Sequence, residues 1–117
     1  MTTGDRRFMP EVATGLPPGE RPMVAVVRAI RGHEDDLAAA ITTLTAAVRR
    51  EPGCREFRSY RDAADPGTFH LYEIYADTDA FRTHLATAHV ARFFTELARH
   101  STADAGALTQ LVELPAP

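Results

Sequence analysis

Apolar and polar residues alternate with two different periods along the chain, and each change of period marks a new element. A β-branched run from Met23 to Ile30 is short and nearly uninterrupted, which favours a strand over a helix. From Glu34 to Arg50, apolar residues recur every three or four positions, which predicts an amphipathic helix. The acidic first turn and basic last residues follow the order that the helix dipole favours. Glu51-Pro52-Gly53 predicts the end of this helix.

A hairpin pattern follows. Cys54 to Arg61 and Thr68 to Ala76 are strand candidates, and the segment between them, rich in Asp, Pro and Gly, is typical of a reversing loop. We therefore expect the two strands to form an antiparallel hairpin.

The last third of the chain predicts two helical stretches and a strand. Asp77 or Thr78 can cap a short helix that runs to Leu85. The stretch from His89 to His100 places Val90, Phe93, Phe94 and Leu97 on one face, and we expect the helix to break near Thr87. The apolar segment from Ala107 to Leu114 is expected to be the final strand.

The order of these elements predicts an α+β fold of the ferredoxin-like βαββαβ type, an antiparallel sheet with helices on one face. Both sides of the first and last strands are largely apolar, and the helices can cover only one side of the sheet. We therefore expect a second copy of the chain to close over the other side as a homodimer. The chain divides into a flexible N-terminal arm (residues 1–22), one domain (23–114) and a tail (115–117).

Composition and charge exclude several classes of protein. The net charge of -3 comes from interspersed acids and bases, so nucleic acid is not an expected partner. No apolar run is long enough to span a bilayer, and the N-terminus lacks the pattern of a signal peptide. The single cysteine, Cys54, excludes an internal disulfide, is expected to be a packing residue, and agrees with a cytoplasmic location.

Polar side chains gather among aromatics on the third strand and on the helices after it. His84 is expected at the edge of a buried helix face, where it could act as a base or be a hydrogen-bonded structural residue. Glu73 shares a strand face with Phe69, whereas Tyr72 lies on the opposite face. The candidate catalytic residues are His84, His89, Tyr72 and Glu73, and the candidate substrate-binding residues are Arg58, Tyr60, Phe69, Phe81 and Phe93.

No metal or organic cofactor is expected. His84 and His89 are five residues apart, which is not the spacing that places two ligands on one helix face, and no cysteine lies near them. No Gly-rich loop for phosphate or a dinucleotide follows any predicted strand.

These motifs resemble one family. The Glu-Pro-Gly-Cys turn, the acidic Pro-Gly hairpin, the Tyr-Glu pair on a strand and the histidines after it occur in the run EPGCREFRSYRDAADPGTFHLYEIYADTDAFRTHLATAHVARF. This run is similar to the antibiotic biosynthesis monooxygenase domains, and the resemblance extends from Met23 to Leu114. It implies a homodimeric α+β barrel with an apolar pocket between the sheet and helices of each subunit. The chain has no tryptophan, unlike family members that degrade heme by distorting the porphyrin, so heme degradation is disfavoured.

The resemblance also implies a reaction. Oxygenase members of the family use neither metal nor flavin, and the expected function is monooxygenation of a small aromatic or polyketide-like compound, such as an anthrone or quinol, by O2. His84 or His89 would be the base, and Tyr72, Glu73 or Arg58 would hold the substrate oxygens. Two alternatives stay open, namely an isomerase or cyclase that needs no O2 and a non-catalytic dimer that binds a small ligand.

Overall fold

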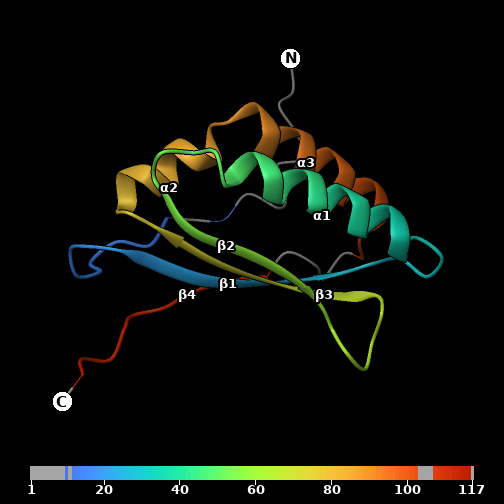
Figure 1. Cartoon of the computed structure of the whole chain (residues 1–117), viewed down its shortest axis with the longest axis horizontal. Helices are drawn as coiled ribbons and strands as arrows, with labels where there is room; N and C mark the ends of the chain where they lie inside the picture. Colours follow the sequence, from blue (N-terminus) through green and yellow to red (C-terminus); the bar gives the residue numbers. More distant parts are fainter. Residues whose placement is uncertain (1–9, 11, 103–106, 117) are drawn as a thin grey trace.

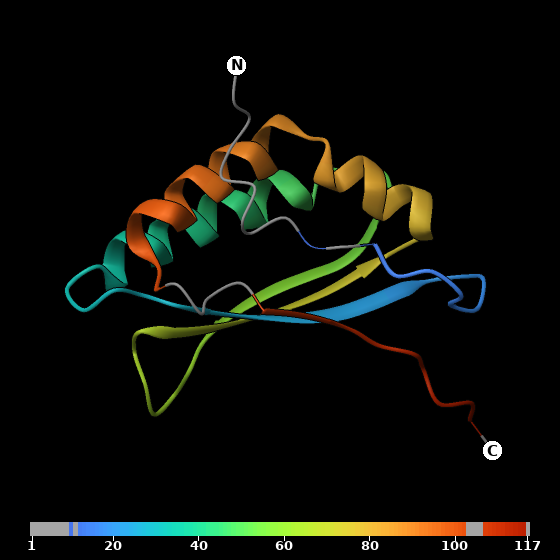
Figure 2. The same ribbon diagram turned by 180° about the vertical axis from the view of Figure 1, so that it is seen from behind.

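The chain folds into one antiparallel sheet covered on one face by three helices. The computed structural model describes residues 10, 12–102 and 107–116. Figures 1 and 2 show the helices packed together on the same side of the sheet. The elements in order are β1 (Arg21–Arg28), α1 (Glu34–Val48), β2 (Cys54–Arg61), β3 (Thr68–Tyr75), α2 (Thr78–Leu85), α3 (Ala88–His100) and β4 (Ala107–Gln110).

The sheet has the strand order β2-β3-β1-β4, with every neighbouring pair antiparallel. β3 lies between its hairpin partner β2 and the N-terminal strand β1, so Tyr72 pairs with Arg58 on one side and with Val24 on the other. This topology confirms the ferredoxin-like α+β fold that the order of elements predicts.

The core lies between the helices and the upper face of the sheet. The apolar stripe of α1 (Leu37, Ile41, Leu44, Val48) and that of α3 (Val90, Phe93, Phe94, Leu97) are buried, as their spacing predicts. Alternate residues of the strands meet these stripes because successive strand side chains point to opposite faces. The buried strand residues include Met23, Ala25, Val27, Phe57, Phe69, Leu71 and Tyr75.

The break between α2 and α3 is formed by two capped helix ends. The Asp77 carboxylate accepts a hydrogen bond of 2.7 Å from the Ala80 amide at the start of α2. At the break, the Thr87 hydroxyl donates to the His84 carbonyl and accepts from the Val90 amide. Thr87 therefore caps α3 where the sequence predicts the break, and the chain changes direction there.

Several element ends differ from the predictions. β1 begins at Arg21 and ends at Arg28, where the chain leaves the sheet because the Ile30 amide bonds to the His100 carbonyl at 2.8 Å. β4 ends at Gln110 rather than at Leu114. The Leu111 amide still donates to the Pro22 carbonyl at 2.9 Å, but Pro22 has no N–H to return the bond, and β1 begins one residue earlier, at Arg21. The helix α1 ends at Val48, before the two arginines that were expected to complete it.

Part of the predicted N-terminal arm, residues 1–9 and 11, lies outside the described residues. Pro10 and Val12 lie against the domain: Val12 packs on the core and Pro10 borders an internal cavity. The buried Arg21 guanidinium donates to the carbonyls of Gly19 and Pro17, which fixes the chain just before β1.

The face of the sheet that points away from the helices, called the lower face, is not covered by any described element. It carries the partly exposed Val24 and Val26 of β1, together with Tyr60 and Tyr72, whose residues are 50% and 36% exposed. The C-terminal segment after β4 leaves the sheet on the side away from the helices (Figures 1 and 2), and its Leu114 is 86% exposed. Among the described residues, no helix has the length and apolarity needed to cross a membrane.

Candidate active site

A carboxylate and two imidazoles meet where the end of α1 faces the break between α2 and α3. Glu51 lies in the turn after α1, His84 in the last turn of α2 and His89 in the first turn of α3. His84 Nδ1 lies 2.9 Å from Glu51 Oε2, and His89 Nε2 lies 2.5 Å from the same oxygen. Glu51 therefore bridges the two histidines, and we call these three residues the buried triad.

Two local features bring the triad together. The break at Thr87 turns α3 away from the axis of α2, so that two histidines five residues apart face the same carboxylate. Gly53 then lets the Glu51 turn approach α2 closely, since a Cβ at position 53 would lie 2.5 Å from the Ala80 Cβ. The Ala76 amide donates to the Gly53 carbonyl at 2.8 Å and holds the turn in this place.

The hydrogen bonds determine the charge and the tautomer of the triad. Burial raises the pKa of Glu51, but the hydrogen bonds from His84 and His89 outweigh it and leave that pKa below its usual value. An ionised Glu51 accepts from both rings, which assigns the proton of neutral His84 to Nδ1. Nε2 of His84 is then the basic nitrogen, and it is not hydrogen-bonded to any of the described residues.

A second carboxyl lies on β3, next to His84. Glu73 is buried and accepts a hydrogen bond of 2.7 Å from the Tyr75 hydroxyl. Burial raises the pKa of Glu73 and outweighs the opposing hydrogen bond from Tyr75. The Tyr75 ring packs on the His84 ring with centroids 4.7 Å apart. Tyr75 therefore connects Glu73, through its hydroxyl, with the buried triad, through its ring.

Glu73 and His84 both border an apolar cavity between the sheet and the helices. Its volume is about 60 Å³, which is far below the roughly 300–1,000 Å³ of typical small-molecule pockets. The cavity is lined by Pro10, Ala25, Val27, Leu44, Phe57, Leu71, Glu73, Phe81, His84, Leu85, Val90, Phe93, Phe94, Leu97 and Leu108. Its two titratable lining residues therefore face a largely hydrocarbon surface.

Four of the residues singled out in the sequence border this cavity, namely Glu73, Phe81, His84 and Phe93. His89 lies next to them through Glu51 but borders a separate groove of about 540 Å³ between α1 and α3. Phe69 is buried on the same sheet face without lining the cavity, and the Arg61 guanidinium lies 5.1 Å from the centre of its ring.

The other three lie on the opposite face of the sheet, outside the cavity. Tyr72 follows the strand alternation and points away from Glu73, as the sequence predicts. Arg58 and Tyr60 share this lower face, and Arg58 forms an exposed ion pair of 2.8 Å with Glu56. The expectation that Tyr72 and Arg58 hold substrate beside His84 therefore has to be corrected for the cavity of the same chain, because the sheet separates them from it.

Glu51 and Tyr75 were not among the predicted site residues. Glu51 was interpreted only as part of a helix stop, and its contact with two histidines 33 and 38 residues later depends on tertiary packing. The spacing argument against a metal site also fails in three dimensions, since ligand atoms of all three triad residues lie within 4.8 Å of one another. A signal existed in the Glu-Pro-Gly turn itself, where Glu51 lies two residues before a glycine that permits close packing.

Several proteins of known structure share this fold. Protein PA3566 of Pseudomonas aeruginosa is 24% identical, with a TM-score of 0.77 over 91% of this chain and 100% of that chain. Rv0793 of Mycobacterium tuberculosis is 23% identical, with a TM-score of 0.76 over 83% of this chain and 97% of that chain. A protein described as an antibiotic biosynthesis monooxygenase is 24% identical, with a TM-score of 0.76 over 81% and 99%. At this level of identity the likeness shows the fold alone.

The sequence comparison is more specific. A search of the curated proteins finds no match. The sequence profile of antibiotic biosynthesis monooxygenases matches residues 23–108, a span that contains the buried triad, Glu73 and almost all of the cavity lining. Since the match covers well over half of the chain, the protein belongs to the antibiotic biosynthesis monooxygenase family.

Proposed function

We propose that this protein is a monooxygenase that oxidises a small aromatic or polyketide-like compound, such as an anthrone or a quinol, with O2 and without a bound cofactor. The observation that carries the proposal is the pairing of His84 with Glu51 at the edge of an apolar cavity. A base held by a carboxylate and facing a dry cavity is what deprotonation of a weakly acidic carbon or phenol requires. The family is consistent with this chemistry.

The proposed reaction starts with a proton transfer to His84 Nε2. Glu51 stabilises the resulting imidazolium through Nδ1–H. The substrate anion gives one electron to O2, and the two radicals combine to form a C–O bond. The resulting peroxide anion takes the proton back from His84 and becomes a hydroperoxide. For an anthrone, the hydroperoxide then breaks its O–O bond and loses water. One oxygen atom stays as the new carbonyl, and the other leaves in water with the two hydrogens of the substrate methylene.

Glu73 is suited to the second half of this reaction. Its raised pKa means that it keeps its proton to a higher pH than a free carboxyl does. A neutral carboxyl beside the cavity can donate a proton to the oxygen that leaves the hydroperoxide. We therefore propose His84 as the base and Glu73 as the acid.

The size of the cavity sets a condition on this proposal. A volume of about 60 Å³ holds a few water molecules but no fused aromatic ring system. Substrate entry therefore requires lining side chains to move. Among the lining residues, Pro10 alone belongs to neither the sheet nor the helices.

An isomerase or cyclase is the second candidate, and one observation favours it. A base and an acid on the same cavity can remove a proton from one atom of a substrate and return it at another without O2. In both candidate reactions His84 is the base and Glu73 the acid, and the reactions differ in whether O2 is consumed.

We also propose that the protein is a homodimer that acts in the cytoplasm. The uncovered sheet face carries Val24, Val26 and Tyr72, and the exposed Val112 and Leu114 extend beyond it. A second copy placed face to face would cover these apolar side chains. The single cysteine in the sequence supports the cytoplasm.

The test is oxygen uptake by the purified, metal-free protein with a panel of anthrones, hydroquinones and naphthols, repeated without oxygen. Consumption of one O2 per quinone formed supports the monooxygenase, and product formed anaerobically supports the isomerase or cyclase. The matched variants are His84→Ala, which should abolish turnover, and His33→Ala, a histidine outside the cavity, which should not. Absence of turnover with every substrate would argue for a binding role.

A further inference from the structure

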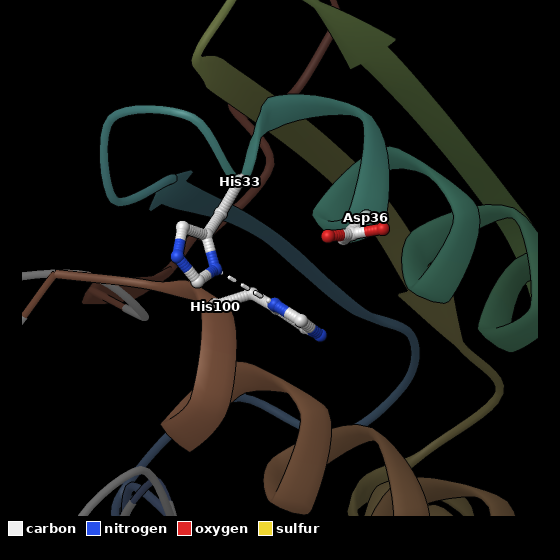
Figure 3. Close-up of side chains that lie close together, drawn as sticks. All are labelled: His33, Asp36 and His100. Atoms are coloured by element: carbon white, nitrogen blue, oxygen red, sulfur yellow. Dashed lines mark hydrogen bonds between the residues drawn. The ribbon is translucent and has the colours of Figure 1, made fainter.

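A second group of two histidines and a carboxylate lies away from the cavity, where the start of α1 meets the end of α3. His33 immediately precedes α1, Asp36 is in the first turn of that helix and His100 is the last residue of α3 (Figure 3). The Nδ1 atoms of His33 and His100 are 3.0 Å apart, and one ligand atom from each of the three residues lies within 4.8 Å of the others. We propose that this group, the surface triad, binds a divalent transition-metal ion such as Zn²⁺.

The distance between the imidazoles fits such an ion. Two nitrogens bound to one tetrahedral Zn²⁺ at its usual bond length are about 3.3 Å apart, which is close to the observed separation. Without an ion, one ring must donate its proton to the other across this short distance. A metal ion replaces that proton and binds both lone pairs.

The backbone holds both histidines in place without help from a metal. The Ile30 amide donates to the His100 carbonyl at 2.8 Å, and the His33 amide donates to the Ile30 carbonyl at 2.8 Å. Gly32, between them, has a φ of +90°, which a residue with a side chain rarely adopts. Loop and helix end thus form a fixed frame, so little ordering is needed when the ion binds.

The two helix ends at the site have opposite dipoles. His100 lies at the negative end of α3, and His33 lies at the positive end of α1. Glu34 bonds to the Gly32 amide and Asp35 pairs with Arg61, so Asp36 is the carboxylate of this turn that supplies negative charge to the two rings. Imidazole and carboxylate together suit Zn²⁺, Cu²⁺ and Ni²⁺ better than Mg²⁺ or Ca²⁺.

Asp36 completes the ligand set. Asp36 is exposed, so its side chain is free to turn toward the rings of His33 and His100. Three protein ligands leave a fourth position for water. Asp36 and His100 also border the groove between α1 and α3, so this open position would face the groove.

The test is a titration of the full chain, with no affinity tag and after treatment with a chelator, with Zn²⁺ in a calorimeter and with Co²⁺ in visible absorption. We expect one site per chain, with a Kd raised at least about tenfold in His33→Ala, Asp36→Ala and His100→Ala. The matched control is His70→Ala, which removes an exposed histidine paired with Asp62 and should leave the Kd unchanged.

Three results would overturn the proposal: no binding at millimolar Zn²⁺, equal affinity in wild type and His100→Ala, or loss of binding in His89→Ala instead, which would place the ion in the buried triad. Folding of each variant is checked by circular dichroism. A second measurement does not depend on variants that fold: Zn²⁺ should shift the imidazole NMR signals of two histidines in the wild-type protein, and those of His70 should stay in place. None of these readouts depends on the oxygenase activity.

Discussion

Each of the two triads of this protein consists of two histidines and one carboxylate, but the carboxylate takes a different place in each. In the buried triad, Glu51 lies between His84 and His89 and accepts a hydrogen bond from each ring. In the surface triad, the two rings contact each other through Nδ1, and the carboxylate of Asp36 stands beside them.

The difference shows that the position of the carboxylate decides which chemistry a pair of histidines can perform. A carboxylate between two imidazoles fixes their protons and leaves a basic nitrogen on the far side of each ring, which suits proton transfer. Two imidazoles that face each other instead direct their lone pairs at one point, which suits a cation. Residue type alone would not separate these cases.

The largest expected effect is on turnover. His84→Ala removes the proposed base, and kcat/KM for oxygen uptake should fall by about 10² to 10⁴. His33→Ala removes a histidine of the surface triad and should leave kcat/KM nearly unchanged. The comparison is made with whichever substrate of the panel is turned over. Equal losses in the two variants would mean that the buried triad has no special role in the reaction.

The next effect is on stability. Glu51→Ala leaves two largely buried rings without their acceptor and should lower the free energy of unfolding by about 2 kcal/mol. The matched change, Asp36→Ala, removes an exposed carboxylate and should change it by less than about 0.5 kcal/mol. Urea unfolding of both variants at neutral pH measures the difference. A loss as large for Asp36 as for Glu51 would contradict the structural distinction.

The buried triad should also contribute to the pH dependence of stability. The folded-state pKa of Glu51 is depressed, so its contribution is present above the unfolded value of about 4.5 and is lost as the pH falls through the folded value. Glu51→Gln should therefore flatten the loss of stability in acid. Urea unfolding between mildly acidic and strongly acidic pH tests this, and parallel curves for wild type and Glu51→Gln would count against it.

The smallest expected effect has the opposite sign and concerns Glu73. Its folded-state pKa is raised, so its contribution is fully present below the unfolded pKa and is lost as the pH rises through the folded value. Glu73→Gln cannot ionise, so its stability relative to wild type should improve steadily from acidic to alkaline pH. Thermal unfolding across this range measures the trend. A constant difference would show that Glu73 titrates normally.

The sequence predicts most of the fold because its patterns are local. The stripes of α1 and α3 repeat at helical spacing, and both Asp77 and Thr87 cap helices where the sequence places them. Strand alternation also separates Glu73 from Tyr72 correctly. The prediction for the end of β4 was wrong because apolar residues continue past Gln110, whereas pairing with β1 weakens at Pro22, which has no N–H, next to the start of β1.

The site was harder to predict because its residues meet only after folding. His84 and Glu73 could be singled out from their strand and helix positions, but Glu51 comes from a turn more than thirty residues earlier. The surface triad joins residues 67 positions apart, His33 and His100, through a loop whose path no periodicity describes. Arg58 and Tyr60 were predicted to bind substrate because residue type alone does not tell which face of the sheet is covered.

The close approach of Gly53 to Ala80 also limits how this protein can evolve. A methyl group at position 53 would press on α2 and move Glu51 relative to His84. Neither residue touches the cavity, yet their combined size sets the alignment of the proposed base. Relatives that keep the buried triad should therefore keep glycine at the position of Gly53, or combine a larger residue there with glycine at the position of Ala80.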